Sequence, residues 1–434
     1  MIELEGNRIE EEPDLLFDEA DTSAVSKVPY WGLRNYGPYS KETDTIRIGI
    51  ISPGNKVKEI ESLVRDLNEG THIFPGGMPQ FFRCKIDIEK MLTIKTEDIK
   101  EYEDAALNFV KSSDPKKIDL VLAYTRKTSR YFANTPYYRL KAIFTSHGFP
   151  TQIITQSTFN NLKYSYLNLA SALFAKAGHI PWVLQSEMKN VDMILGISVS
   201  NVISYKNRAG NARRFVGYVN VFDTYGKWLF FEGTAKSYRK DEKLIQLKAL
   251  LESAVSKFKA TNEIEPKKVV IHHWKRFSHD EIETVEKTLS NSVGDHNTAF
   301  VTIDDSHSFR MYDTESEDGS SPRGHYAHLG NMGILLSTTG ATKISAHRMG
   351  TPKILHISCI QKPTEFLETA DIVMQIFSLT KLNWASATPL IREPVSTVFS
   401  RKIAYLTATI TDPIWTGIAS SDVSATLNNK TWFI

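Results

Sequence analysis

An alternation of short apolar strands and helices between residues 46 and 176 constrains the fold more than any other feature of the sequence. The apolar runs and the helical periodicity predict, in order, a strand at Ile46–Ile51, a strand at Ile118–Ala123, a helix from Pro136, a short strand at Gln152–Thr155 and a helix from about Phe159 to Lys176. This order favours a doubly wound parallel sheet. Such sheets bind ligands at the carboxyl ends of their strands, so we expect the N-terminus of the helix from Pro136 to lie at that edge.

A second α/β unit is predicted after residue 182, with a different order of elements. The expected elements are a strand at Val191–Val199, a hairpin from Phe215–Phe222 to Trp228–Phe231, a helix from about Asp241 to Phe258, a strand at Lys268–His272, a helix after the capping pair Ser278 and Glu281, and a strand at Ile354–Ile357. The order strand, hairpin, helix, strand, helix fits a ribonuclease-H-like fold. Residues 303–328 are polar, which predicts a long surface loop.

The bulk composition is that of a globular protein and limits its partners. The chain has 434 residues, 41% hydrophobic and 24% charged, which predicts about two or three domains. Because the formal net charge is only +2, any nucleic-acid-binding surface must be a local basic patch. Cys84 and Cys359 lie far apart, and the sequence has no signal-peptide pattern or long apolar run. We therefore expect a cytoplasmic protein without direct membrane insertion.

The first 40 residues are acidic and have few apolar positions. The acidic side chains between residues 10 and 21 are Glu10, Glu11, Glu12, Asp14, Asp18, Glu19 and Asp21. We expect residues 1–40 to form a solvated N-terminal arm. The alternative is a docking surface for another protein or for a basic groove of the same chain.

The helix that begins at a Thr-Pro pair has the features of an anion site. Thr135 can cap this helix, and Tyr137 and Lys141 then lie four residues apart on one face. A helix N-terminus with a cation and a phenol on that face suits a phosphate. Gln152 and Lys176 come from later elements and could converge on the same place. Taken singly, a helical lysine is usually a solvated charge, and Tyr137 could be an ordinary half-buried phenol.

A set of motifs runs in order along most of the chain, from about residue 31 to residue 434. They are WGLRNYGPY at 31–39, the Tyr137 and Lys141 pair, Gln152, Lys176 in AKAGHIPW, VDMILGISVS, KKVVIHHWKRFS and the terminal TWFI. Together they resemble the MID and PIWI domains of Argonaute proteins, and more narrowly the short prokaryotic Argonautes that lack the N-terminal and PAZ domains. After the arm expected at 1–40, the resemblance implies a Rossmann-like MID domain at 41–182 and a ribonuclease-H-like, inactive PIWI domain at 183–434.

In that family, a pocket of the MID domain binds the 5′ phosphate of a guide strand. The resemblance assigns this pocket to Tyr137, Lys141, Gln152, Lys176 and Ile434. The two lysines would offset the phosphate charge, and Tyr137 would stack on the first unpaired base. The family often adds Mg²⁺ or another divalent cation between the phosphate and the terminal carboxylate, which implies Gln152 and Ile434 as metal ligands. The two aromatic residues before Ile434 would hold it in place.

The PIWI domain of catalytic members cleaves the target strand with two divalent metals held by several carboxylates. At the corresponding positions this chain has Ser198, Trp274 and Arg401, and Glu242 is only a weak counterpart of a fourth, mobile Glu. A serine, a tryptophan and an arginine cannot hold two Mg²⁺ ions. The resemblance therefore implies that the chain is not an enzyme and has no catalytic residues.

Other polar residues have weaker assignments. His272 and His273 are adjacent on a predicted strand and so face opposite ways, which favours a structural role over metal binding. The candidates for contacts with the backbone of a nucleic-acid duplex are Lys206, Arg208, Arg213, Arg214, Arg276, Arg392, Arg401 and Lys402. Each of them alone is more often a surface charge, and backbone contacts should be several and salt-sensitive.

The resemblance implies a function in guided recognition. A short guide RNA or DNA would pair with a complementary target nucleic acid, and the protein would read backbone and shape without cleaving the target. The output would go to an effector protein encoded nearby, such as a NAD-consuming or membrane-active one, in prokaryotic defence against plasmids or phages. Two alternatives stay open. One is a guided nuclease with an unusual carboxylate set that includes Asp192, Asp223 or Glu242, and the other is a protein–protein scaffold that no longer binds nucleic acid.

Overall fold

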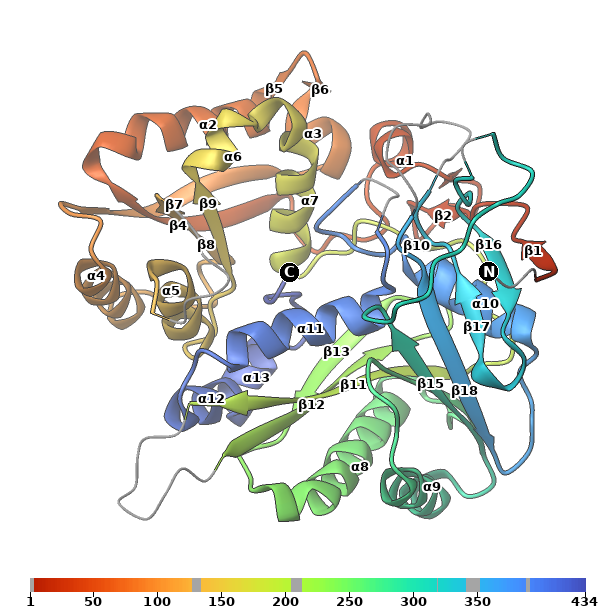
Figure 1. Cartoon of the computed structure of the whole chain (residues 1–434). Coiled ribbons are helices and arrows are strands. Elements are labelled where there is room, and N and C mark those ends of the chain that lie inside the picture. The colour runs from red at the N-terminus through yellow and green to blue at the C-terminus, as the bar shows by residue number, and fades with distance from the viewer. Residues whose placement is uncertain (1–3, 127–133, 204–212, 318, 341–351, 388–390) are drawn as a thin grey trace.

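The chain forms two lobes, each built around a β-sheet (Figure 1). The computed structural model describes residues 4–126, 134–203, 213–317, 319–340, 352–387 and 391–434. The smaller sheet belongs to residues 45–155 and the larger one to a strand at residues 6–8 and to strands between residues 193 and 362. The described part of the chain contains no helix that is both long and apolar enough to span a membrane.

The smaller sheet is parallel throughout, in the order β7-β4-β8-β9. Its strands are β4 (Thr45–Pro53), β7 (Lys85–Ile94), β8 (Leu120–Thr125) and β9 (Thr151–Thr155). Helices α4 (Ile99–Lys111) and α5 (Pro136–Thr145) lie on one face, and α2 (Val57–Glu69), α3 (Gly77–Phe82) and α7 (Tyr166–Lys176) on the other (Figure 1). The predicted doubly wound parallel sheet is confirmed.

The predicted helix from Phe159 to Lys176 is in part wrong, because the chain breaks before α7. Helix α6 (Gln156–Asn160) and a 3₁₀ turn at Leu162–Tyr164 precede it. Asn161 Nδ2 donates to the main-chain oxygen of Ser157, and Ser165 Oγ donates to the main-chain oxygen of Asn161. Such local side-chain bonds compete with helical pairing and account for the break.

The larger sheet has nine strands in the order β1-β16-β17-β18-β15-β14-β11-β12-β13. Their bounds are β1 (Gly6–Arg8), β11 (Met193–Val202), β12 (Arg214–Phe222), β13 (Trp228–Gly233), β14 (Lys268–His273), β15 (Asn297–Asp304), β16 (His325–His328), β17 (Ile334–Leu336) and β18 (Leu355–Lys362). Strand β14 is parallel to both β11 and β15, whereas the other neighbours are antiparallel. The predicted 303–328 loop therefore ends in a strand, β16.

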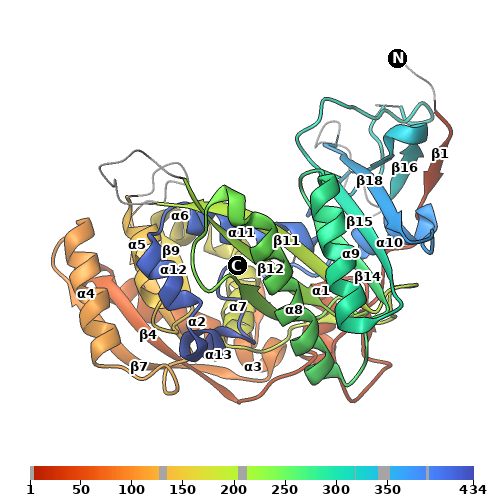
Figure 2. The same ribbon diagram turned by 90° about the horizontal axis from the view of Figure 1, so that it is seen from below.

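Helices cover both faces of the large sheet. Helices α8 (Lys243–Asn262) and α9 (His279–Val293) lie on one face, as the view from below shows (Figure 2), and α11 (Val395–Thr407) lies on the other. Ser278 and Glu281 form the predicted capping box of α9. Helix α11 approaches β11 closely, since a Cβ atom on Gly196 would lie 2.3 Å from the main-chain oxygen of Ser396.

The N-terminal segment is not a solvated arm, so that expectation is wrong for the described residues. Strand β1 pairs with β16 at the edge of the large sheet, and Leu15 and Phe17 are fully buried. Glu12 receives a hydrogen bond of 2.6 Å from Arg323 Nε and lies 3.4 Å from Lys381 Nζ. The acidic segment thus docks on buried basic residues of its own chain, which was the alternative interpretation.

Shorter elements complete the fold and connect the lobes. They are α1 (Pro29–Tyr36), α10 (Thr369–Leu379), α12 (Asp412–Ile418), α13 (Ser421–Leu427), the small sheet of β2 (Leu15–Leu16), β3 (Val25–Ser26) and β10 (Val183–Leu184), and the pair β5 (Gly70–Thr71) and β6 (Phe74–Pro75). Helix α7 contacts the second lobe through Ser171 Oγ, which donates to the main-chain oxygen of Trp384 at 2.6 Å. The C-terminus lies between α7 and α11 (Figure 1).

Candidate functional site

Five predicted residues meet where the two lobes join, and we call them the lysine pocket: Tyr137, Lys141, Gln152, Lys176 and Ile434. Lys176 Nζ donates to Gln152 Oε1 at 2.6 Å and also to the main-chain oxygen of Ile434. Lys141 Nζ lies 5.6 Å from the centre of the Tyr137 ring. Strand β9, helices α5 and α7 and the C-terminal residues therefore each contribute a side chain or an oxygen to one place.

The terminal residues are fixed by aromatic packing in the second lobe. Trp432 packs edge-on against Phe231 with the ring centres 5.6 Å apart. Phe433 lies 5.0 Å from the Phe399 ring of α11 and 5.7 Å from Trp228. Because these rings belong to the buried core, the main-chain oxygen of Ile434 is held in a fixed position beside Lys176.

Both lysines are buried, and no acidic side chain of the described residues pairs with them. Lys141 and Lys176 are 6% and 1% exposed. Among the described residues, neither ammonium forms an ion pair with a carboxylate side chain. Burial lowers the pKa of Lys141 to about 8. Burial, followed by the charges of Lys141 and Lys402, lowers the pKa of Lys176 well below its usual value. No acidic side chain of the described residues therefore balances positive charge in the pocket, and burial disfavours the charged form of each lysine until an anion binds.

Helix α5 begins where the sequence predicts, but the side-chain hydroxyl of Thr135, the residue before it, has no partner among the described residues. Thr135 is the residue before the helix and Pro136 occupies the first turn. The predicted side-chain cap is wrong, because Thr135 Oγ1 caps no main-chain N–H group. In the described part of the chain this buried hydroxyl has no hydrogen-bond partner. The N-terminal turn that carries Tyr137 therefore holds an additional polar group available to a ligand.

The expected divalent cation does not fit this arrangement. The predicted ligands are Gln152 and the terminal carboxylate of Ile434. Lys176 Nζ already donates to Gln152 Oε1 and to the main-chain oxygen of Ile434. An ammonium group therefore stands where a bridging cation would have to stand. A second ammonium, that of Lys141, is near enough for its charge to lower the pKa of Lys176. A doubly charged ion would add repulsion where Mg²⁺ prefers anionic oxygen ligands.

The carboxyl edge of the large sheet carries the second predicted set of residues. Ser198 lies on β11 and is fully buried, and Trp274 follows β14 directly. The register pairs Gly196 with His272, so Ser198 and Trp274 lie side by side, and Trp274 Nε1 donates to Ser198 Oγ at 3.0 Å. The two residues satisfy each other and offer no carboxylate.

Arg401 lies in a group of four charged residues that we call the arginine cluster: Arg392, Arg401, Asp305 and Glu393. Arg401 Nη1 donates to Asp305 Oδ2 at 2.9 Å and to Glu393 Oε1 at 3.0 Å. Arg392 Nη2 also donates to Asp305 Oδ2. Burial tends to raise the pKa of Asp305, but its contacts with the two arginines lower it to about 2. For Glu393, burial has the larger effect and raises the pKa. Sequence reasoning missed Asp305 and Glu393; the signal for Asp305 was its place after the apolar run of β15.

Comparison with known proteins identifies the family. Residues 97–411 match the Piwi domain family. The chain belongs to this family. Over 342 residues it is 25% identical to the protein argonaute of Aquifex aeolicus, which corresponds to 76% of this chain and 44% of that protein.

Solved Argonaute and Piwi structures have the same fold. The Clostridium butyricum Argonaute bound to a guide DNA and a 19-mer target DNA matches with a TM-score of 0.73 at 20% identity, over 94% of this chain and 54% of that one. The A. aeolicus Argonaute gives 0.66 at 21% identity over 92% and 53%, and Drosophila Piwi gives 0.69 at 14% identity over 99% and 56%. The chain thus spans about half the length of these relatives. The predicted resemblance and the mixed α/β fold with a ribonuclease-H-like Piwi domain are confirmed.

The other acidic candidates of the Piwi domain have structural positions. Asp192 directly precedes β11, and its Oδ2 accepts from the main-chain N–H groups of Lys267 and Lys268. Asp223 accepts two main-chain N–H groups within its hairpin turn, and Glu242 accepts the N–H group of Arg239. The described residues contain no group of three or more His, Cys, Asp or Glu side chains that could hold a metal ion.

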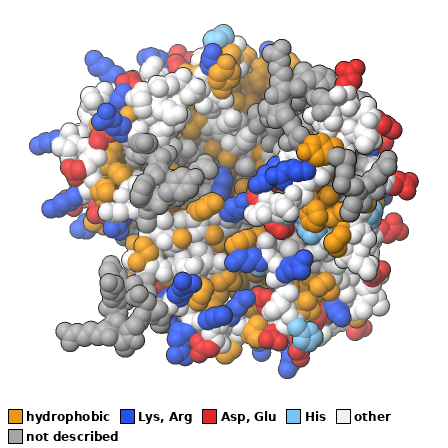
Figure 3. All heavy atoms as spheres, viewed as in Figure 1, with side chains coloured by type: hydrophobic (Ala, Val, Ile, Leu, Met, Phe, Trp, Pro, Cys, Tyr) orange, Lys and Arg blue, Asp and Glu red, His pale blue; other side chains and the backbone are white. Residues whose placement is uncertain are grey.

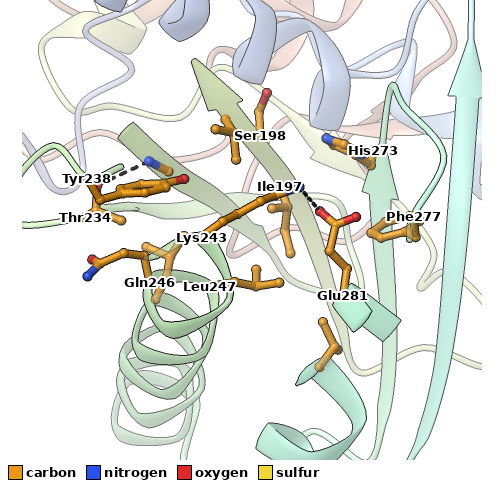
Figure 4. Close-up of a pocket in the computed structure, with 14 residues that line it drawn as sticks. Ile197, Ser198, Thr234, Tyr238, Lys243, Gln246, Leu247, His273, Phe277 and Glu281 are labelled. Atoms are coloured by element: carbon orange, nitrogen blue, oxygen red, sulfur yellow. Dashed lines mark hydrogen bonds and ion pairs between the residues drawn. The ribbon is translucent and has the colours of Figure 1, made fainter. Parts of the chain in front are cut away.

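The histidine pair faces opposite sides of the sheet, as its strand position predicts. His272 Nδ1 lies 2.7 Å from Ser396 Oγ on α11, and burial lowers the His272 pKa to about 3. His273 lies on the other side, in a pocket between the sheet and helices α8 and α9 (Figure 4). That pocket is largely apolar, and the Lys243–Glu281 ion pair of 2.6 Å lies across it, so its charges are already paired.

The predicted basic residues other than Arg392 and Arg401 differ in their surroundings. Lys206 and Arg208 lie outside the described residues. Arg213 and Arg276 are exposed, whereas Arg214 donates to Ser237 and is held in the sheet. Lys402 on α11 is close enough to lower the pKa of Lys176 by its charge, which places α11 beside the lysine pocket. Lys and Arg side chains gather across the middle of the face in Figure 3, where the two lobes meet.

Proposed function

We propose that this Piwi-domain protein binds the 5′-phosphorylated end of a short guide strand and uses it to recognise a complementary RNA or DNA without cleaving it. The observation that carries the proposal is the lysine pocket, in which two buried ammonium groups converge without an acidic side chain to neutralise them. A terminal phosphate monoester carries about two negative charges at neutral pH and offers three acceptor oxygens. It would satisfy both lysines and the orphaned hydroxyl of Thr135.

The geometry favours a strand end over a continuous backbone. Lys141 and Lys176 are almost fully buried, so only a group that enters the pocket can reach them. A terminal phosphate can enter, whereas an internal phosphodiester would have to bring two nucleosides with it. Tyr137 lies at the entrance turn of α5 beside Lys141, where its ring can stack on the first base.

The absence of cleavage is part of the proposal. The resemblance assigns Ser198, Trp274 and Arg401 to the positions of metal-binding carboxylates. In this structure Trp274 donates to Ser198, and Arg401 donates to Asp305. A two-metal reaction needs several free carboxylates around the attacked phosphate. The alternative carboxylates are already hydrogen-bonded to main-chain N–H groups, which holds for Asp192, Asp223 and Glu242. A binding function is therefore favoured over a nuclease with an unusual carboxylate set.

Recognition without cleavage needs an output. We propose that a partner effector protein supplies it, in prokaryotic defence against plasmids or phages. The part of the proposal that concerns guided recognition is supported by the Clostridium butyricum relative, which is described as bound to a guide DNA and a target DNA.

The experiment compares nucleic acids that copurify with the parent protein and with Lys141→Met/Lys176→Met. Methionine keeps side-chain volume and removes both charges, so the pocket stays packed. We expect the parent to retain short strands with 5′ phosphates and the variant to lose them. The matched control is Lys85→Ala/Lys95→Ala, which removes two exposed lysines of the same lobe and should retain the strands.

The result also separates the alternatives. A scaffold that no longer binds nucleic acid would give no copurifying strands in any variant. Retention of the same strands by the pocket variant would show that the lysine pocket is not the binding site. Cutting of a matched target by purified, guide-loaded protein with Mg²⁺ or Mn²⁺ would contradict the proposal of recognition without cleavage.

A further inference from the structure

The arginine cluster has a geometry that its internal ion pairs do not explain. The two carboxylates lie deeper than the two guanidinium groups: Asp305 and Glu393 are 13% and 12% exposed, and Arg392 and Arg401 are 23% and 29% exposed. The two carboxylates thus contact the arginines from the protein interior. The outer edges of the guanidinium groups remain on the solvent side, already oriented.

Helix α11 places this cluster next to the lysine pocket. Lys402 acts on Lys176 within the pocket, and Arg401 is the preceding residue of the same helix. One turn further along, Tyr405 is 53% exposed and close enough to Arg401 to affect the pKa of its guanidinium. Arg401 and Tyr405 therefore share a helix with Lys402, and Arg392 lies just before the first residue of that helix.

We propose that Arg401 and Arg392, held by Asp305 and Glu393, form a second, metal-free site that binds an internal backbone phosphate of the nucleic acid. The proposal rests on the proposed guide-binding function, and it concerns a different phosphate. The site lies at the carboxyl edge of β15, next in the sheet to β14, which Trp274 follows. A guanidinium fork presents paired N–H groups that match two phosphate oxygens.

Pre-organisation explains why paired arginines can still bind a phosphate. A guanidinium has five N–H donors, and Arg401 uses two nitrogens on the carboxylates below it. Because the side chain is already ordered, little conformational entropy is lost when the phosphate binds. Because the pKa of Asp305 is about 2, its carboxylate beneath the arginines stays negatively charged near neutral pH.

The phosphate could belong to the guide or to the paired target, and the experiment distinguishes the two. Binding of a single 5′-phosphorylated strand to the free protein is measured first, and binding of the complementary strand to the loaded protein second, each across a salt series. We expect Arg401→Gln to weaken one of the two steps by about tenfold. The slope of log affinity against log salt for that step should fall by about 0.7 to 0.9, the value for one lost phosphate contact.

Three further variants keep the proposal falsifiable. Asp305→Asn retains both arginines but removes one of the charges that hold them in place, so the affected step should weaken by less than it does in Arg401→Gln. Arg401→Lys keeps the cation without the fork and should keep the salt slope while losing part of the affinity. Arg65→Gln removes an exposed arginine on α2 and should match the parent.

Thermal melting of each variant separates folding from binding. If the cluster were only structural, Arg401→Gln and Asp305→Asn would both lower the melting temperature, and neither would change the affinity or salt slope of a folded sample. That result would overturn the proposal. The effect of Arg401→Gln should be the same for 5′-phosphate and 5′-hydroxyl strands, whereas loss of the lysine pocket should affect only the former. Failure of either site is therefore visible separately.

Discussion

The lysine pocket and the arginine cluster are both basic, but they handle their charge in opposite ways. In the pocket, two ammonium groups are buried and no acidic side chain of the described residues neutralises them. In the cluster, two half-buried guanidinium groups lie above two carboxylates and are already paired. An uncompensated buried charge indicates a ligand that the fold lacks, whereas a compensated one is stable without it. We therefore expect large, discrete effects at the pocket and graded, salt-dependent effects at the cluster.

The largest expected effect concerns the 5′ end of the strand. The parent should bind a 5′-phosphorylated strand about 100-fold or more tightly than the same strand with a 5′ hydroxyl, because two charge-assisted hydrogen bonds contribute roughly 1.5–3 kcal/mol each. Fluorescence anisotropy with the two strands measures the ratio. The ratio should fall towards one in Lys141→Met/Lys176→Met and stay unchanged in Arg401→Gln. A ratio near one in the parent would remove the difference between the two regions.

The next effect is a pH dependence of about tenfold. Burial lowers the pKa of Lys141 to about 8, so this lysine is mostly charged at pH 7 and mostly neutral at pH 9. The phosphate is already ionised across this range, since its second pKa is about 6. Affinity for the 5′-phosphorylated strand should therefore fall about tenfold between pH 7 and 9. Binding of the 5′-hydroxyl strand is the control, and it should change much less.

The same pKa shift acts on folding with the opposite sign. In the unfolded chain Lys141 keeps its proton up to a pKa of about 10.4, whereas the folded, empty protein releases it near 8. Between these values the unfolded state binds more protons, so the contribution of Lys141 to the free energy of unfolding rises with pH. Weaker strand binding above pH 8 thus cannot be ascribed to unfolding through this group. If strand affinity and the free energy of unfolding fell together above pH 8, the assignment of the pH dependence to Lys141 would be contradicted.

The sequence predicts much of the pocket because local rules and the resemblance agree there. The Thr-Pro start of α5 and the position of Gln152 in β9 are both as expected, and Lys176 meets Gln152 at 2.6 Å. The capping box of α9 was equally accessible, because it depends on two residues three apart.

The sequence did not predict features that depend on distant contacts. Leu15 and Phe17 are buried because the N-terminal segment packs on the larger lobe. The acidic composition of that segment predicted an exposed arm instead. Asp305 and Glu393 meet only because β15 and the start of α11 come together across 88 residues of sequence. The broken helix before α7 results from side-chain bonds of Asn161 that helical periodicity does not register. In each case, a tertiary or side-chain contact overrides the local pattern.

The smallest expected effect is that of divalent cations, and it tests how the pocket achieves its charge balance. Lys176 Nζ already donates to Gln152 Oε1 and to the main-chain oxygen of Ile434, the two residues predicted to hold a cation. Removing divalent ions with EDTA should therefore change the affinity for the 5′-phosphorylated strand less than twofold at constant ionic strength. Added Mg²⁺ should act only as a screening salt, with the same effect on the 5′-hydroxyl strand. A tenfold loss with EDTA that Mg²⁺ restores, and that is confined to the phosphorylated strand, would show that Lys176 yields its place to a metal. The pocket would then need a cation to reach the charge balance that the arginine cluster has from its own carboxylates.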